Sequence, residues 1–134
     1  MNKVLIIEDD FALNEALEID LTHQGYQVKS TCDGESALMM VRQEKIDVVI
    51  LDVNLPKMSG FDFINRLHQL HLQIPVIFLS ACDLDEDILK GYDLGADEYI
   101  TKPFNPEILH RKIKVVLKRN IDRNGILFED DRLS

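Results

Sequence analysis

Three polar residues far apart in the chain have side chains suited to acting together on an anion. Asp9, Asp52 and Lys102 each follow closely after a short apolar run, at residues 4–7, 48–51 and 98–101. In a parallel sheet covered by helices, ligands bind in the crevice outside the carboxyl ends of the strands. If the three runs are neighbouring parallel strands, the two carboxylates and the ammonium group meet in one crevice.

The charges of this expected crevice predict a bound cation. Two ionised carboxylates about 4 Å apart repel each other by about 4 kcal/mol at an effective dielectric constant near 20. Carboxylates combined with water favour Mg²⁺, and a carboxylate beside Mg²⁺ and an ammonium group can attack phosphorus to give an aspartyl-phosphate. Ser80, after the run at 76–79, either donates a hydrogen bond to a phosphoryl oxygen or simply begins a loop.

The composition is that of an ordinary globular domain. Of the 134 residues, 46% are hydrophobic and 29% charged, which supports one buried core and argues against global disorder. The net charge of −9 argues against a grip on nucleic-acid phosphates by this segment. Cys32 and Cys82 are 50 residues apart, outside any metal-ligand spacing, and are too few for a disulfide framework. Without a signal peptide or an apolar run near the ~20 residues that span a bilayer, we expect a soluble, cytoplasmic domain with no membrane contact.

Apolar runs alternate regularly with amphipathic stretches. The predicted strands are residues 4–7, 28–32, 48–51, 76–79 and 99–100, and the predicted helices lie around residues 13–21, 35–43, 61–67, 88–92 and 106–116. Asp10 is placed to cap the first helix and Gly25 to end it. Five strand–helix pairs predict right-handed crossovers and a doubly wound parallel α/β sheet.

The pattern changes after residue 119. Residues 121–125 are typical of a linker, and residues 126–128 are either a strand of something further along or part of a frayed tail. We therefore expect one domain over residues 1–120 and a separate segment over residues 121–134.

Four separated motifs resemble the receiver domain of two-component response regulators. They lie at residues 7–10, 51–61, 75–81 and 95–104, and the resemblance covers residues 1 to about 120. It implies the flavodoxin-like strand order 2-1-3-4-5 with five helices. It also implies a signalling domain rather than an enzyme. Such a domain takes a phosphoryl group from a sensor histidine kinase and loses it slowly by itself.

The resemblance gives each acid of the crevice a role. Asp52 is the phosphoacceptor and also holds the metal. Asp9 is a direct Mg²⁺ ligand, Glu8 acts through water, and the backbone carbonyl of Asn54 is the third protein ligand. The acids of the first motif therefore form, together with Asp52, a magnesium site.

The same resemblance assigns the switch. Ser80 is the switch hydroxyl, Tyr99 the switch aromatic and Lys102 the lysine that pairs with the phosphoryl group. A cis bond is implied between Lys102 and Pro103, which costs only about 0.5–1 kcal/mol for a bond that precedes proline.

The Glu-Asp form of the acidic pair and the string at residues 97–104 are similar to the OmpR/PhoB subfamily. In that subfamily the receiver precedes a winged-helix DNA-binding domain, and residues 126–128 would suit its first strand. DNA would then be bound only through a C-terminal domain, with transcription as the regulated output.

In that subfamily, phosphorylation creates a homodimer through the surface of the fourth helix, the fifth strand and the fifth helix. The residues expected on that face are Ile88, Asp93, Asp97, Glu98, Ile108, Lys112 and Lys114. Isoleucines at 88 and 108 stand where the subfamily has a basic–acidic pair. They predict either an apolar contact across the dimer or local packing beside their own helices.

Three other classes remain to be weighed. A haloacid-dehalogenase phosphatase needs an acid two residues after the nucleophile, where this chain has Asn54. A flavodoxin-like FMN carrier needs a phosphate loop after the first strand, where residues 8–10 would repel a phosphate. A receiver-fold interaction module that works without phosphorylation is the alternative function.

Overall fold

A sheet of five parallel strands forms the centre of the molecule, in the order β2-β1-β3-β4-β5. The computed structural model describes the backbone of residues 1–133 and the side chains of residues 1–120. The strands are β1 (Lys3–Ile7), β2 (Gln27–Thr31), β3 (Val48–Leu51), β4 (Val76–Ser80) and β5 (Glu98–Thr101). Every predicted apolar run lies on one of these strands, and the predicted strand order is confirmed.

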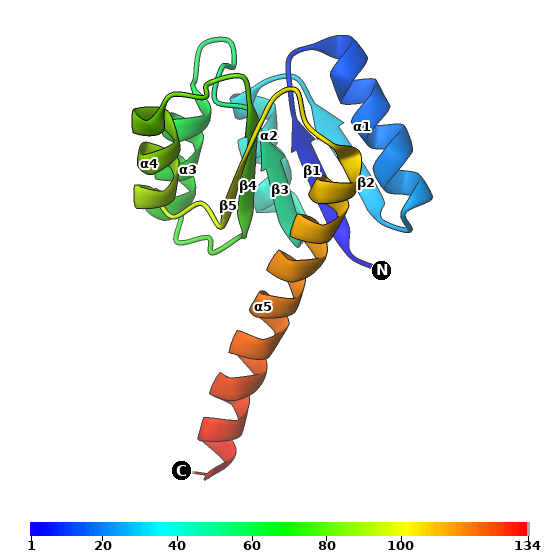
Figure 1. Ribbon diagram of the computed structural model, residues 1–134. Coiled ribbons are helices and arrows are strands. Elements are labelled where there is room, and N and C mark those ends of the chain that lie inside the picture. The colour runs from blue at the N-terminus through cyan, green and yellow to red at the C-terminus, as the bar shows by residue number, and fades with distance from the viewer. Residues whose placement is uncertain (134) are drawn as a thin grey trace.

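Helices cover both faces of the sheet (Figure 1). They are α1 (Phe11–His23), α2 (Gly34–Gln43), α3 (Gly60–Gln69), α4 (Asp85–Asp93) and α5 (Pro106–Leu133). The helices α1 and α5 share one apolar core with the sheet, and α2 and α3 share the other. No helix in the part of the chain that the structure describes combines the length and apolar composition needed to cross a bilayer.

Alternation along β1 shows why the sheet needs helices on both sides. Val4 and Ile6 pack in the core under α1 and α5, whereas Leu5 and Ile7 pack in the core under α2 and α3. All four side chains are fully buried. A strand that is buried on both faces has to be apolar at every position, which is the pattern that the sequence showed.

Local capping fixes the loops that follow the strands. Asp10 caps α1 by accepting a hydrogen bond from Leu13 N, as predicted. Ser59 begins α3 in a reciprocal capping box with Asp62. Gly25, with a φ of 95°, follows the end of α1 in the left-handed conformation that favours glycine. The caps at Asp10 and Ser59 therefore fix the starts of α1 and α3 after the carboxyl ends of β1 and β3.

The C-terminal segment differs from the expectation. The helix α5 continues over residues 121–133, where the sequence predicted a linker and a strand or frayed tail at 126–128, and Figure 1 shows this part extending beyond the sheet. A strand needs a neighbouring strand for its backbone hydrogen bonds, whereas a helix satisfies them within itself. No proline follows Pro106 to interrupt the helix. The side chains of residues 121–134 lie outside the described ones.

Candidate functional site

An acidic cluster lies where the strand order reverses, at the carboxyl ends of β1 and β3. The two strands are neighbours, with Ile7 paired to Leu51, and the loops that follow them both lie along the upper edge of the sheet in Figure 1. Glu8, Asp9 and Asp52 each offer a carboxylate oxygen, and these oxygens lie within 4.8 Å of one another. Such a reversal is the place where parallel sheets bind ligands.

Lys102 reaches this cluster from the loop after β5. Its Nζ lies 2.6 Å from Glu8 Oε1 and 2.9 Å from Asp52 Oδ2. Its backbone N–H donates to the Ser80 carbonyl at 2.8 Å, which joins the loop to the end of β4. The Lys102–Pro103 bond is cis, as the resemblance implied. The structure thus brings together the three residues from which the sequence analysis began.

Burial and charge oppose each other in this cluster. Burial raises the pKa of Glu8 above its ordinary value, although hydrogen bonds from Lys102 and from the Asp10 N–H favour the ionised form. Burial by itself lowers the pKa of Lys102, but its hydrogen bonds to Glu8 and Asp52 outweigh this, so that the pKa lies above its ordinary value. Lys102 is therefore protonated at neutral pH and supplies the positive charge that two buried carboxylates require.

The donor set fits a magnesium ion. Three carboxylates are close enough to share one cation, and Asp9 is exposed, which leaves the set open to the waters that Mg²⁺ retains. Asn54 N donates to Asp52 Oδ1 at 3.1 Å, which fixes the loop after β3 against the carboxylate. Oxygen ligands, an open side and net negative charge are the properties that Mg²⁺ needs, so the predicted ligands are suitable for it.

Ser80 and its loop lie beside the cluster. Ser80, the last residue of β4, is fully buried, and its Oγ accepts a hydrogen bond from Cys82 N at 3.2 Å. The Cys82 Sγ lies 3.3 Å from Asn54 Nδ2. Sequence reasoning gave Cys82 no contact. The only sequence signal for this contact was that Cys82 lies two residues after Ser80, just as Asn54 lies two residues after Asp52.

Tyr99 points from β5 toward the same loop. Its hydroxyl donates to the Cys82 carbonyl at 2.6 Å, and its ring centroid lies 5.4 Å from that of Phe78. Burial raises the pKa of the phenol to about 12. The aromatic residue predicted as part of a switch is thus connected through Cys82 to both Ser80 and Asn54.

Comparison with known proteins agrees with this geometry. A family model described as the response regulator receiver domain matches residues 4–114. The chain belongs to this family. The solved receiver domain of Francisella response regulator 1452 is similar to it, with a TM-score of 0.85, 29% sequence identity, and coverage of 90% of this chain and 99% of that chain.

Curated relatives of this receiver domain are transcriptional regulators. The alkaline phosphatase synthesis transcriptional regulatory protein PhoP of Bacillus subtilis is 38% identical over 88% of this chain and 49% of its own length. The transcriptional regulatory protein AfsQ1 of Streptomyces coelicolor is 40% identical over 89% of this chain and 52% of its own length. The predicted likeness to the OmpR/PhoB subfamily is confirmed, and the chain spans about half the length of these relatives.

Two residues expected on the dimer face of the receiver domain are paired within the chain. Lys112 Nζ lies 2.8 Å from Glu98 Oε1, and Arg119 Nη2 lies 3.2 Å from Glu98 Oε2. Glu98 is buried. The sequence offered Glu98 and Lys112 for ion pairs between subunits, but in this structure they join β5 to α5.

The other residues of that predicted face divide into two groups. Asp93, Ile108 and Lys114 are exposed, whereas Ile88 is half-buried. Asp97 accepts a hydrogen bond from Val76 N at 3.1 Å.

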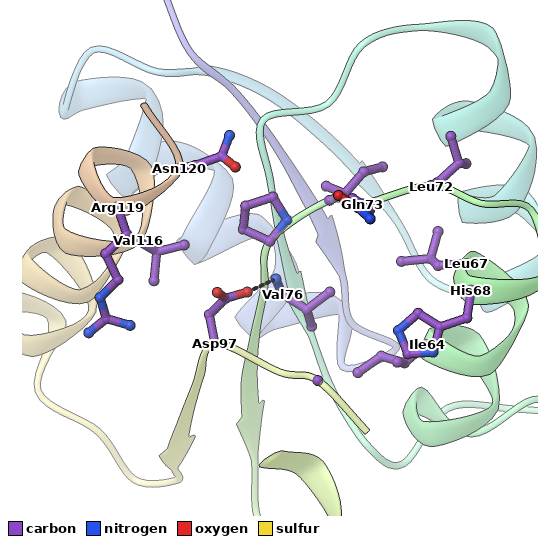
Figure 2. Close-up of a pocket in the computed structure, with 13 residues that line it drawn as sticks. Ile64, Leu67, His68, Leu72, Gln73, Val76, Asp97, Val116, Arg119 and Asn120 are labelled. Carbon is purple, nitrogen blue, oxygen red and sulfur yellow. Dashed lines mark hydrogen bonds between the residues drawn. The ribbon is translucent and has the colours of Figure 1, made fainter. Parts of the chain in front are cut away.

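Asp97 also lines a pocket of about 370 Å³ between α3, the start of β4 and α5, which Figure 2 shows. Its walls include Ile64 and His68 of α3 and Arg119 of α5. The pocket lies by the amino ends of β4 and β5, and it contains none of the crevice residues.

Proposed function

We propose that this receiver domain accepts a phosphoryl group on Asp52 from the phosphohistidine of a sensor histidine kinase. The observation that carries the proposal is the position of Asp52: it is buried, lies within 4.8 Å of two more carboxylates and contacts the Lys102 ammonium group at 2.9 Å. A lone buried carboxylate would be a poor nucleophile because it would take up a proton, but a paired one stays ionised.

In the proposed step, an oxygen of the Asp52 carboxylate attacks phosphorus and a P–O bond forms. The bond between phosphorus and the imidazole nitrogen of the kinase breaks, and its electron pair leaves with the imidazole, which takes a proton from water. The Lys102 ammonium group is placed to stabilise the negative charge on the phosphoryl oxygens.

Magnesium would be held by Asp9, Asp52 and the carbonyl of Asn54, with Glu8 acting through water. Bound there, Mg²⁺ neutralises negative charge between the carboxylates and the phosphoryl oxygens. Asp9, as the exposed member of the set, leaves room for the waters and for the incoming phosphoryl oxygen.

The new group on Asp52 would be detected by three residues. An aspartyl-phosphate carries about −1.5 to −2 charge in place of the single negative charge of the carboxylate, and it adds strong acceptor oxygens. Ser80 Oγ and Lys102 Nζ are the proposed donors to those oxygens, and Lys102 Nζ already lies 2.9 Å from Asp52 Oδ2. A change at Ser80 reaches Cys82, whose N–H donates to Ser80 Oγ and whose carbonyl accepts from the Tyr99 hydroxyl. The conformational change would thus be transmitted from Asp52 to α4 and β5.

The proposed output is a homodimer through the α4–β5–α5 surface, which controls transcription through a DNA-binding domain after α5. The relatives are transcriptional regulators about twice as long as this chain, which supports such a domain. Ile108, 48% exposed on α5, is the residue of the expected face that is both apolar and exposed, and Glu98 and Lys112 of that face already pair with each other within one chain.

Incubation with acetyl phosphate and Mg²⁺, followed by intact-mass measurement, tests the phosphoacceptor. Wild type should gain one phosphoryl group, whereas Asp52→Ala should gain none and chelation of Mg²⁺ should abolish the gain. Asp10→Asn is the matched control: it keeps the helix cap in the same loop and should react like wild type. No gain in wild type would favour the interaction module that works without phosphorylation, and an equal gain in Asp52→Ala would overturn Asp52 as the phosphoacceptor.

Sedimentation of beryllofluoride-treated protein tests the dimer. Wild type should shift from monomer to dimer, and Ile108→Glu should stay monomeric while still taking up a phosphoryl group from acetyl phosphate. A monomer in both treated samples would remove dimerisation from the proposal without affecting Asp52.

A further inference from the structure

The ring of Tyr99 lies against α4 at the one position where that helix has a glycine. Gly91 is buried, and a Cβ built on it would lie 2.9 Å from Tyr99 Cδ2 and 3.2 Å from both Tyr99 Cε2 and Phe78 Cδ2. Real Cβ atoms essentially never approach a neighbour within 3.0 Å. The ring therefore occupies space that any other residue at position 91 would fill.

The backbone does not explain this glycine. Gly25 and Gly95 adopt positive φ, whereas Gly91 has no such value and lies within the regular helix. Glycine inside a helix is less favourable than alanine because it loses more conformational freedom on folding. The glycine instead allows the Tyr99 ring to approach α4 closely.

Three other contacts hold Tyr99 in the same position. Its hydroxyl donates to the Cys82 carbonyl at 2.6 Å, and its backbone N–H donates to the Tyr92 hydroxyl at 3.1 Å. Its ring packs on Phe78. Tyr92 is the neighbour of Gly91 on α4, so α4 contacts both the ring and the backbone of Tyr99.

We propose that Gly91 is a positioning residue that forms a slot for the Tyr99 ring and thereby couples the ring position to the position of α4. With the ring in the slot, the phenol reaches Cys82, and α4 lies close to β5. A side chain at position 91 forces either the ring out of the slot or α4 away from β5. The significance for signalling rests on the proposed role of Tyr99 as a switch, but the slot itself can be tested without phosphorylation.

The first test measures the titration of the Tyr99 phenol in Gly91→Ala. All three tyrosines are replaced by 3-fluorotyrosine, which lowers phenol pKa values and keeps the titration in a range where the fold persists, and the ¹⁹F resonances are assigned with single Tyr→Phe variants. Burial raises the pKa of Tyr99 from 10.0 to about 12, so a ring expelled into water should become up to about 100-fold more acidic. Leu89→Ala, an exposed change on the same helix, should leave the titration unchanged.

The second test asks whether the effect of a methyl group at position 91 depends on the ring. Gly91→Ala should lower the urea midpoint of wild type because of the clash. In a Tyr99→Ala background the same change should lower the midpoint much less or raise it, because the ring is gone and only the helix preference and the 3.2 Å approach to Phe78 Cδ2 remain. This comparison still tests the slot for the Tyr99 ring if Gly91→Ala alone folds poorly.

An unchanged Tyr99 titration in Gly91→Ala, or an equal effect of Gly91→Ala in both backgrounds, would overturn the slot. Neither readout involves Asp52 or a phosphoryl group. Failure of the acetyl phosphate experiment would therefore leave the slot standing, and failure of the slot would leave Asp52 as the phosphoacceptor.

Discussion

Replacing Lys102 by methionine tests whether the crevice depends on a single internal cation. Lys102 Nζ is the only group in the described part of the chain that bridges Glu8 and Asp52, at 2.6 and 2.9 Å. The two carboxylate side chains are only 4% and 7% exposed. Methionine keeps the length and the apolar stem of lysine but removes the charge.

The expected cost follows from the geometry. Carboxylate oxygens within 4.8 Å of each other repel by about 3.5 kcal/mol at an effective dielectric constant near 20. Removal of one partner from a buried ion pair costs about 3–5 kcal/mol. Since Asp9 is exposed and water can enter from its side, we expect Lys102→Met to lose about 2–4 kcal/mol of unfolding free energy without divalent metal.

Urea unfolding in a chelating buffer at neutral pH measures this loss. The matched control is Lys3→Met, because Lys3 Nζ contacts Glu44 Oε1 at a similar distance of 2.8 Å but Glu44 is 29% exposed. Surface pairs of this kind contribute about 0–1 kcal/mol. The difference between the two variants therefore reports the burial of the carboxylates rather than the loss of an ammonium group as such.

Added Mg²⁺ should then stabilise the variant more than wild type. A ligand that binds only the folded state stabilises it by an amount that rises with the logarithm of its affinity, and a site freed of the competing ammonium group should bind the metal more tightly. The reasoning fails if Lys102→Met loses no more than Lys3→Met, or if Mg²⁺ stabilises Lys102→Met and wild type equally.

Three other substitutions probe a close approach, a phenol and a buried histidine. A Cβ on Gly60 would clash with the Asp52 carbonyl oxygen, so Gly60→Ala should lose about 1–3 kcal/mol or more in urea unfolding; wild-type stability would contradict the contact. Because burial raises the pKa of Tyr99 from 10.0 to about 12, its contribution to stability is complete below pH 10 and is lost as the pH rises through 12. Urea midpoints of Tyr99→Phe should fall less than those of wild type across that range, and parallel curves would refute the assignment. His110 Nε2 lies 2.6 Å from Asp20 Oδ2, so His110→Leu should lose about 1–2 kcal/mol by the same assay, and an unchanged midpoint would show that the contact contributes nothing.

The sheet and the acidic crevice could be predicted because their signals are local. Each strand that is buried on both faces, such as residues 48–51, needs a continuous apolar run, and the sequence displays it. Once the strands are parallel, topology alone brings the residues after them to one edge. Asp9, Asp52 and Lys102 therefore met as expected, although 93 residues separate the first from the last.

Contacts between helices and strands could not be predicted in the same way. Glu98 and Lys112 both carry charges that suit a surface, and only the packing of α5 on β5 decides that they face each other within one chain. His110 is buried against α1, where Asp20 is its partner, and no motif in the sequence marks that contact. Such pairs depend on the rotation of a helix about its axis, which an apolar stripe defines only to within a residue or so.

The geometry of Lys102 connects the proposed metal requirement to the proposed sensing of phosphate. One ammonium group serves two buried carboxylates in this structure. If Asp52 carries a phosphoryl group, a charge of about −1.5 to −2 in place of the single carboxylate charge attracts that ammonium group, and Glu8 is left buried without its partner. A cation held by Asp9 and its neighbours would then compensate Glu8, so the proposed metal would be needed after phosphoryl transfer as well as during it. A receiver with Lys102 alone would have to protonate Glu8 in order to respond, whereas one with a bound cation can release Lys102 to the phosphoryl group at neutral pH.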